Sequence, residues 1–228
     1  GQVYNVSQLR QDILTITDLY GQKGYAYAEA NPISKLNDED RTAELSVEVD
    51  KGKKVYVGKI EVLGNIKTRD TVIRREFRVK EGELFDGAKL KRSKQRINNL
   101  NFFEDVKIDT HRGEDPDLID ILTTVTEKPT GSFTVGAGFS SVENLIFTTS
   151  ISQNNLFGNG QQLNLTAQLS SIRANFNLGF TEPRLFDSQV SFGVDAVNQK
   201  SNFFSFNTQS TGGGFLLGKN ISEYDSVN

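Results

Sequence analysis

The sequence predicts α+β modules in residues 1–128, followed by an antiparallel transmembrane β-barrel portion of about six strands. Three observations lead to this prediction: a drop in charge near residue 130, a helix–strand–strand pattern that occurs twice, and segments that alternate apolar with polar residues. Residues 1–130 carry 22 Lys/Arg and 23 Asp/Glu, whereas residues 131–228 carry 4 and 6. Phe changes in the opposite direction, from 4 to 12. A polar, nearly uncharged, Phe-rich segment suits a surface that faces something other than bulk water.

Composition excludes several classes of function. The chain has no Cys, so we expect no disulfide, no thiolate nucleophile and no Cys-ligated metal, and its one His cannot supply a His-rich metal site. The net charge of −3 gives no overall field that would hold nucleic acid. A run of about 18 apolar residues is missing, which excludes a transmembrane helix, but a transmembrane strand needs only about 9–11 residues. A chain without Met that begins at Gly1 is expected to be a fragment or a processed product.

The first module is predicted as helix, strand, strand. Apolar residues recur on one face of Ser7–Gln22, and Ser7 is a good residue to cap that helix. A strand is expected from Ala26 to about Lys35, and a second one follows because apolar residues alternate there. We expect these alternating side chains to face the helix, so that Leu45 is buried; they are Ala43, Leu45, Val47 and Val49.

The second module repeats this pattern and adds an opening half. A strand begins at Val55, a short helix that Thr68 would cap follows, and then come a longer helix over Gly87–Leu100 and two strands. The complete unit is therefore β-α-α-β-β over Val55–Lys128. Residues 1–52 are a partial copy that lacks its first strand and helix, residues 53–128 are a complete copy, and residues 129–228 are the barrel strands. Pro129 marks the junction, because proline cannot donate to a sheet ladder.

Six segments after the junction alternate apolar with polar residues. Their polar face is small and uncharged, which suits a hydrated lumen, and their apolar face suits lipid. The alternative is a soluble β-sandwich in which the apolar faces meet in a core. Six strands cannot close a barrel, since single-chain barrels begin at about eight. The predicted lipid-facing residues are Phe133, Val135, Leu165, Leu169, Phe176, Leu178, Phe192 and Val194, and the predicted lumen-facing ones are Thr134, Asn164, Thr166, Asn175, Asn177 and Ser191.

Five stretches of the sequence resemble the BamA family, the central subunits of the bacterial outer-membrane β-barrel assembly machine. They are "VYVGKIEVLGNIKTRDTVIRREF", "INNLNFFEDVKI", "VTEKPTGSFTVGAGFSS", "NNLFGNGQQLNL" and "GFTEPRLFDSQVSFGV". The resemblance covers essentially the whole chain, and the repeat units are similar to POTRA domains, the periplasmic modules of that family. The family's barrel has roughly sixteen strands, of which about six are present here.

The resemblance implies an assembly factor that folds and inserts β-barrel proteins in the outer membrane of Gram-negative bacteria. Its partners would be accessory outer-membrane lipoproteins such as BamD in a BAM complex, unfolded outer-membrane clients and the lipid bilayer, with no nucleic acid. The alternatives are a secretion pore of the same superfamily, which exports an unfolded partner, and a passive or enzymatic channel with a periplasmic domain. Catalytic residues, metal ligands and cofactors are all expected to be absent, so the chain is expected not to be an enzyme.

The motif Arg74-Arg75-Glu76 is the candidate partner site. By resemblance, the matching helix docks an accessory lipoprotein, and Glu76, expected to be exposed, is the best single partner residue. The simpler interpretation is a surface charge pattern with Asp70.

The first barrel strand is the candidate lateral gate. Its residues are Gly131, Ser132, Phe133, Thr134, Val135, Gly136, Ala137, Gly138 and Phe139. Gly136 and Gly138 weaken the strand, and its outer edge would then open and pair with an incoming strand by β-augmentation. The alternative is that these glycines only relieve crowding in the lumen.

Two other features have simple interpretations. The basic helix "KLKRSKQR" would be a solvated helix face, with lipid headgroups or nucleic acid as the alternatives. His111 would be a solvated histidine in a polar turn, because no nucleophile lies near it in the sequence.

Overall fold

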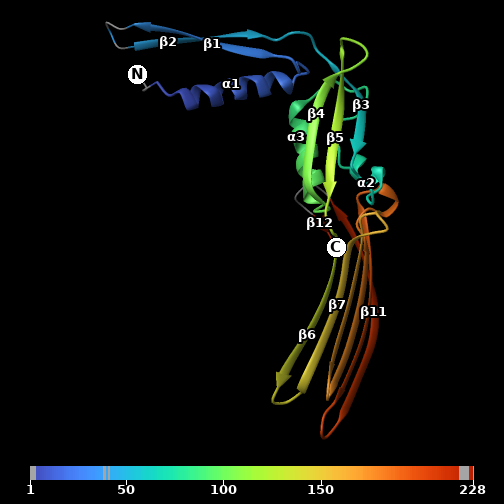
Figure 1. Ribbon diagram of the computed structural model, residues 1–228. Coiled ribbons are helices and arrows are strands. Elements are labelled where there is room, and N and C mark those ends of the chain that lie inside the picture. Colours follow the sequence, from blue (N-terminus) through green and yellow to red (C-terminus); the bar gives the residue numbers. More distant parts are fainter. Residues whose placement is uncertain (1–3, 38–39, 41, 221–225, 228) are drawn as a thin grey trace. The chain divides into compact units, whose positions relative to one another are not determined.

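The chain forms two compact units in a computed structural model that describes residues 4–37, 40, 42–220 and 226–227 (Figure 1). The first unit comprises 1–64, 76–99 and 105–125, and the second comprises 65–75, 100–104 and 126–228. The short helix α2 (Asp70–Arg74) therefore belongs to the same unit as the barrel strands. The sequence-based boundaries at residues 52/53 and 128/129 stay predictions.

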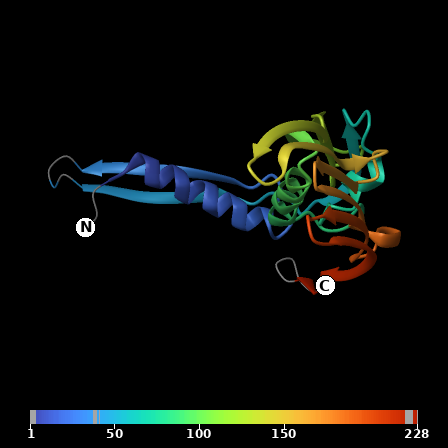
Figure 2. The same cartoon turned by 90° about the horizontal axis from the view of Figure 1, so that it is seen from below.

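The first unit begins with helix α1 (Val6–Gly21), which lies alongside the antiparallel pair β1 (Glu29–Asn37) and β2 (Thr42–Asp50) (Figure 2). The helix starts one residue earlier than expected. Its cap is Asn5 rather than Ser7, because the Asn5 Oδ1 accepts hydrogen bonds from the backbone N–H groups of Ser7 (2.9 Å) and Gln8 (3.3 Å).

The expectation that Leu45 is buried against this helix is wrong. Leu45 remains 43 % exposed and Val49 36 % exposed, and no residue of α1 is buried. One helix beside two strands encloses no core among the described residues, so alternation along β2 produces only a half-covered face.

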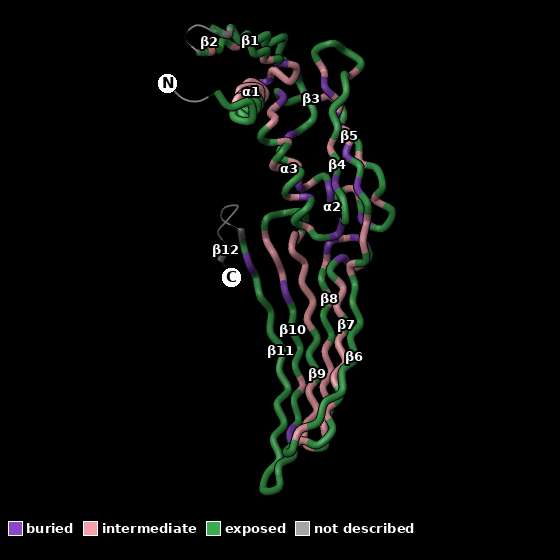
Figure 3. The backbone as a smooth tube through the Cα atoms, turned by 60° about the vertical axis from the view of Figure 1, so that its left-hand side comes forward, coloured by how far each residue is buried: buried purple, intermediate pink, exposed green. Residues whose placement is uncertain are grey.

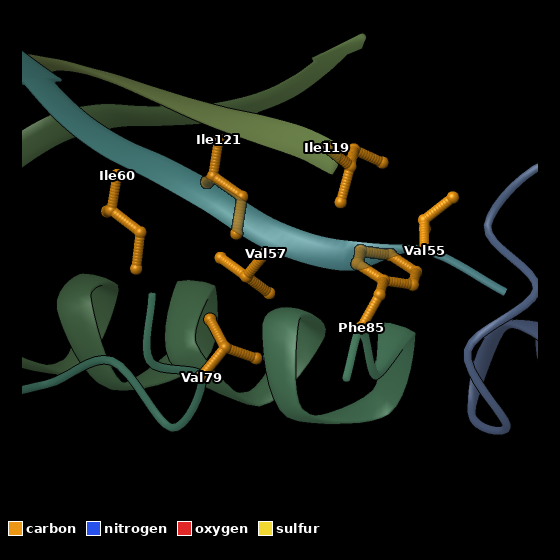
Figure 4. Packing of buried hydrophobic residues seen from close by; sticks show 7 residues of the cluster. All are labelled: Val55, Val57, Ile60, Val79, Phe85, Ile119 and Ile121. Carbon is orange, nitrogen blue, oxygen red and sulfur yellow. The ribbon is translucent and has the colours of Figure 1, made fainter. Parts of the chain in front are cut away.

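A three-stranded sheet in the order β3-β5-β4 forms the core of the first unit. The elements follow the predicted β-α-α-β-β order: β3 (Tyr56–Leu63), α2, α3 (Gly87–Asn99), β4 (Phe103–Arg112) and β5 (Leu118–Glu127). Strand β3 runs parallel to β5. Figure 4 shows the buried cluster on this sheet, in which residues of β3, β5 and the position just before β3 meet two residues from the segment between the helices; its members are Val55, Val57, Ile60, Val79, Phe85, Ile119 and Ile121.

The second unit is dominated by an antiparallel sheet of consecutive strands. They are β6 (Gly131–Ser140), β7 (Asn144–Leu156), β8 (Gln161–Ser170), β9 (Arg173–Glu182), β10 (Val190–Asn202), β11 (Asn207–Asn220) and the short β12 (Ser226–Val227). A 3-10 turn, η1 (Leu185–Asp187), joins β9 to β10. Residues 212–214 lie inside β11 and do not interrupt it.

This sheet is a single layer, as its mostly exposed and intermediate residues in Figure 3 indicate. Phe133 is 68 % exposed and Phe147 53 % exposed, and no second sheet covers them within the described residues. The β-sandwich alternative is therefore wrong, and the prediction of an incomplete antiparallel barrel is confirmed. Among the described residues, no helix is both long and apolar enough to cross a membrane.

Candidate functional site

Strand β6 lies at the edge of the described sheet, and its register shows which of its residues form hydrogen bonds with β7. Among the described residues it pairs with β7 alone. Just before the strand, the Thr130 carbonyl accepts a hydrogen bond from the Asn154 N–H (3.0 Å). Hydrogen-bonded pairs alternate along an antiparallel ladder, so even-numbered residues of β6 bond to β7. The odd-numbered residues, including Phe133, Val135 and Ala137, therefore direct their backbone N–H and C=O groups toward the open edge.

The glycines of β6 are not forced by crowding from this chain. A Cβ added at Gly136 or Gly138 would meet no described atom within 4 Å. Within the described residues their effect therefore lies in the backbone, because glycine gives the strand more conformational freedom. This observation disfavours the crowding alternative within the described part of the chain.

The strand register places all eight predicted lipid-facing residues on one face of the sheet. Phe133 lies opposite Ile151, which lies opposite Leu165, which in turn lies opposite Leu178. On the other face Ser152, Asn164 and Gly179 form an equivalent row that continues to Asp195. The sheet thus has one apolar and one polar face, and contact of the apolar face with lipid stays a prediction.

The three residues of the Arg74-Arg75-Glu76 motif have different surroundings. Arg74 forms an ion pair with Asp70 one helical turn earlier, as the simpler interpretation expected, and its side chain is 42 % exposed. The Arg75 side chain is only 14 % exposed, and its guanidinium lies 3.4 Å from the Asp187 carboxylate in η1. The motif is therefore not one continuous exposed patch.

The expectation that Glu76 is exposed is wrong. Its side chain is 7 % exposed and forms an ion pair with Arg96 of α3 at 2.5 Å. A buried carboxylate needs such a charged partner, because burial without one is costly. The sequence pattern places Arg96 on the solvated face of its helix and does not indicate this ion pair. A partner that reached Glu76 would have to compete with this ion pair.

The remaining candidates keep simple interpretations. Lys89, Lys91 and Lys94 of α3 are exposed, while Ser93 and Ile97 on the same helix are buried. His111 is exposed, although it lies near the end of β4 and not in a turn. No group of three or more His, Asp or Glu residues in the described ranges could hold a metal ion.

A hydrogen-bonded loop that the sequence did not reveal lies between β3 and α2. Thr68 does not cap α2. Instead its N–H and that of Lys67 donate to the Glu127 carboxylate at 2.6 Å and 2.9 Å. Burial raises the pKa of Glu127, but the hydrogen bonds from Thr68 and Lys67 outweigh this effect and hold the pKa below its ordinary value. The ionised carboxylate of Glu127 thus holds the loop in place.

Comparisons with known proteins agree with this architecture. Residues 1–52 and 55–128 match the POTRA family, described as a surface antigen variable number repeat, and residues 155–228 match the Omp85 superfamily domain. The outer membrane protein assembly factor BamA of Neisseria meningitidis is 34 % identical over 100 % of this chain and 30 % of its own length. That of Nitratidesulfovibrio vulgaris is 33 % identical over 99 % of this chain and 29 % of its own.

A solved structure extends the likeness to three dimensions. The crystal structure of Haemophilus ducreyi BamA lacking POTRA domains 1–3 matches 99 % of this chain and 44 % of its own, with a TM-score of 0.85 and 29 % identity. A POTRA repeat that leads into an Omp85 sheet defines the class of protein. The chain belongs to the POTRA family, and over its whole length it is similar to BamA, which indicates an outer-membrane protein with POTRA domains in the periplasm. It spans about three tenths of the length of these curated relatives.

The two faces of the barrel sheet should respond differently to charge. Leu165→Arg should impair membrane assembly of the full protein, because arginine on the lipid face near mid-membrane costs about 2–4 kcal/mol. Asn164→Arg, one residue earlier on the polar face, should be tolerated. Heat-modifiable migration in gel electrophoresis would report the folded barrel, and spin labels would report contact with lipid-soluble or water-soluble quenchers. If the water-soluble quencher reached a spin label at position 165, the assignment of the lipid-facing and lumen-facing sides would be reversed.

The loop held by Glu127 should loosen in acid. Because the folded-state pKa of Glu127 lies below its ordinary value of 4.5, the charged form stabilises the loop. This stabilisation is complete above about pH 4.5 and is lost as the pH falls through the folded-state pKa. Hydrogen exchange at Lys67 and Thr68, corrected for intrinsic rates, should show a loss of protection in that range. Glu127→Gln cannot titrate and should show no such step; an identical step in this variant would assign the effect to another group.

Proposed function

We propose that this chain is the POTRA-to-barrel section of an outer-membrane protein assembly factor, a protein that folds and inserts other β-barrel proteins. The names of its BamA relatives support this function for the family. Within the chain, the observation that carries the proposal is the position of β6 as the first strand of the described sheet, bonded there to β7 alone, with two glycines that no steric contact in the described residues requires.

The β6 edge would capture a client strand by β-augmentation. Its odd-numbered residues direct backbone donors and acceptors outward, and inside a bilayer each unpaired group costs several kcal/mol. Pairing with an incoming strand satisfies these groups, while the client buries its apolar face in lipid. The driving force is therefore physical, and we propose that the chain needs no catalytic residue, nucleotide or metal of its own. The POTRA domains would receive the unfolded clients in the periplasm.

We also propose that the Arg74-Arg75-Glu76 segment docks an accessory lipoprotein of the BamD type. Arg74 is the member of the motif that a partner can reach directly. Glu76 would contribute by exchanging Arg96 for a cation of the partner, since a carboxylate and a guanidinium form a charge-assisted, often bidentate contact. Arg75 would support the segment from inside through its contact with Asp187.

Two proline substitutions should separate the open edge of β6 from its paired side. Ala137→Pro removes an N–H that points toward the open edge, whereas Gly136→Pro removes one that points toward β7. In the full protein reconstituted with its lipoproteins, Ala137→Pro should leave the protein's own barrel heat-modifiable. Its assembly of an unfolded client should fall at least about tenfold, because 1.4 kcal/mol already corresponds to that factor.

Gly136→Pro should instead impair folding of the protein itself. Client assembly at the normal rate by Ala137→Pro would refute strand capture at this edge. Delivery of the client into the vesicle lumen, without its insertion, would favour the secretion-pore alternative.

A charge exchange tests the partner role of Glu76. Glu76→Lys should reduce both lipoprotein capture and the hydrogen-exchange protection of α3, because breaking a buried ion pair costs about 3–5 kcal/mol. The double variant Glu76→Lys/Arg96→Glu restores opposite charges, so protection should return while capture stays low. Recovery of capture in the double variant would mean that Glu76 acts only on folding. Arg74→Glu, at the exposed position, should reduce capture without loss of protection.

A further inference from the structure

The loop before α2 is bonded through the main chain to the β7–β8 turn of the barrel sheet. The Arg69 N–H donates to the Gly158 carbonyl at 3.0 Å. Gly158 lies in the turn between β7 and β8, and both residues belong to the second compact unit. A backbone bond of this kind holds whatever the side chains are, so it fixes the relative position of the two segments.

A buried side-chain network supports this contact. The Asn155 Nδ2 donates to the Thr68 Oγ1 at 2.9 Å, and the Asn155 Oδ1 accepts from the Gly160 N–H at 2.8 Å. Asn155 is 7 % exposed and Thr68 3 % exposed. Since Glu127 fixes the Thr68 backbone, one continuous network runs from the end of β5 through the loop to the turn. Loss of one member would leave a buried polar group without its partner, which is costly.

Two glycines allow the close approach. Gly158 has a positive φ of 75°, and an added Cβ would overlap the Lys67 carbonyl oxygen. Gly160 has a φ of 76°, and an added Cβ there would lie 2.8 Å from the Arg75 Nη2. The Arg75 guanidinium also forms an ion pair with Asp187 of η1, the turn between β9 and β10 at the same end of the sheet. Arg75 therefore pairs with Asp187 of η1 and lies close to Gly160 of the β7–β8 turn.

We infer that these contacts form a clasp, defined as Thr68, Arg69, Arg75, Asn155 and Gly158, that positions β7 for client capture. Strand β7 is the partner of the gate strand β6 in the described sheet, and it ends at the turn that the clasp holds. The clasp keeps the inner side of the gate fixed, so that opening is confined to the outer edge of β6. Asn155 and Thr68 are positioning residues in this scheme, which rests on the proposed assembly function.

Gly158→Ala tests the clasp, with Gly82→Ala as its matched control. Both glycines have a positive φ, of 75° and 83°, so both substitutions carry the same backbone cost. Only the alanine at position 158 collides with a neighbouring backbone, since a Cβ at Gly82 meets no described atom within 4 Å. In the full protein, Gly158→Ala should raise hydrogen exchange at the β7 end and lower the rate of client assembly on the order of 10- to 100-fold.

Gly82→Ala should change neither hydrogen exchange nor client assembly. Equal exchange at the β7 end in the two alanine variants would refute the clasp. Increased exchange with unchanged client assembly would refute its positioning role. If the wild-type protein assembles no client, the proposed function fails, but the exchange comparison still decides whether the clasp exists.

A second pair of variants separates positioning from general folding. Thr68→Val removes the hydroxyl that Asn155 binds and keeps the side-chain shape, whereas Thr68→Ser retains the hydroxyl. Thr68→Val should keep the heat-modifiable barrel and normal lipoprotein capture, while the rate at saturating client falls and the half-saturating concentration is unchanged. Thr68→Ser should restore that rate. Equal rates for the two variants, or loss of the folded barrel in Thr68→Val, would contradict the positioning role.

Discussion

A backbone amide inside a bilayer has no water to bond, and this constraint organises the second half of the chain. It explains why residues 131–220 are almost entirely antiparallel strand, with each strand bonded to its neighbour in sequence. It also makes any open edge energetically expensive. Strand β6 lies at such an edge of the described sheet, and in the proposed function the cost of leaving this edge unpaired favours pairing with a client strand.

The same requirement for hydrogen-bond partners shapes the loop before α2 in a different way. Here the bonds go to Glu127, Asn155 and a carbonyl of the barrel turn, and no sheet is formed. These contacts are local in space but remote in sequence, because Glu127 lies 59 positions and Asn155 87 positions after Thr68. The second unit thus contains pieces of the second module together with the barrel strands.

Periodic features of the fold could be predicted from the sequence, because alternation and helical spacing are encoded by neighbouring residues. The β-α-α-β-β order and the faces of β6–β10 are such features. The partners of polar groups could not be predicted in this way. Glu76 is predicted to be exposed because its partner Arg96 lies 20 residues away in the sequence, and Thr68 is predicted to cap a helix because Asn155 lies even further away. The predicted burial of Leu45 is wrong for a third reason, because alternation indicates an apolar face but not what covers it.

Glycines illustrate the same limit of sequence reasoning. Gly136 and Gly158 are the same residue type, yet an added Cβ would meet open space at Gly136 and a backbone carbonyl at Gly158. Only the folded chain distinguishes a glycine that loosens a strand from one that permits a close contact.

Helix α2 belongs to the same unit as the barrel strands, and this affects which segments such proteins can exchange by recombination. Repeats are usually regarded as interchangeable cassettes, with cuts made at the linkers that the sequence suggests. A chimera joined at residue 128 would combine a foreign Thr68 and Arg75 with native barrel turns, and so divide one hydrogen-bonded network between two parents. Recombination in this family is therefore expected to favour exchanges that keep residues 65–75 and the turn at 155–160 from the same parent.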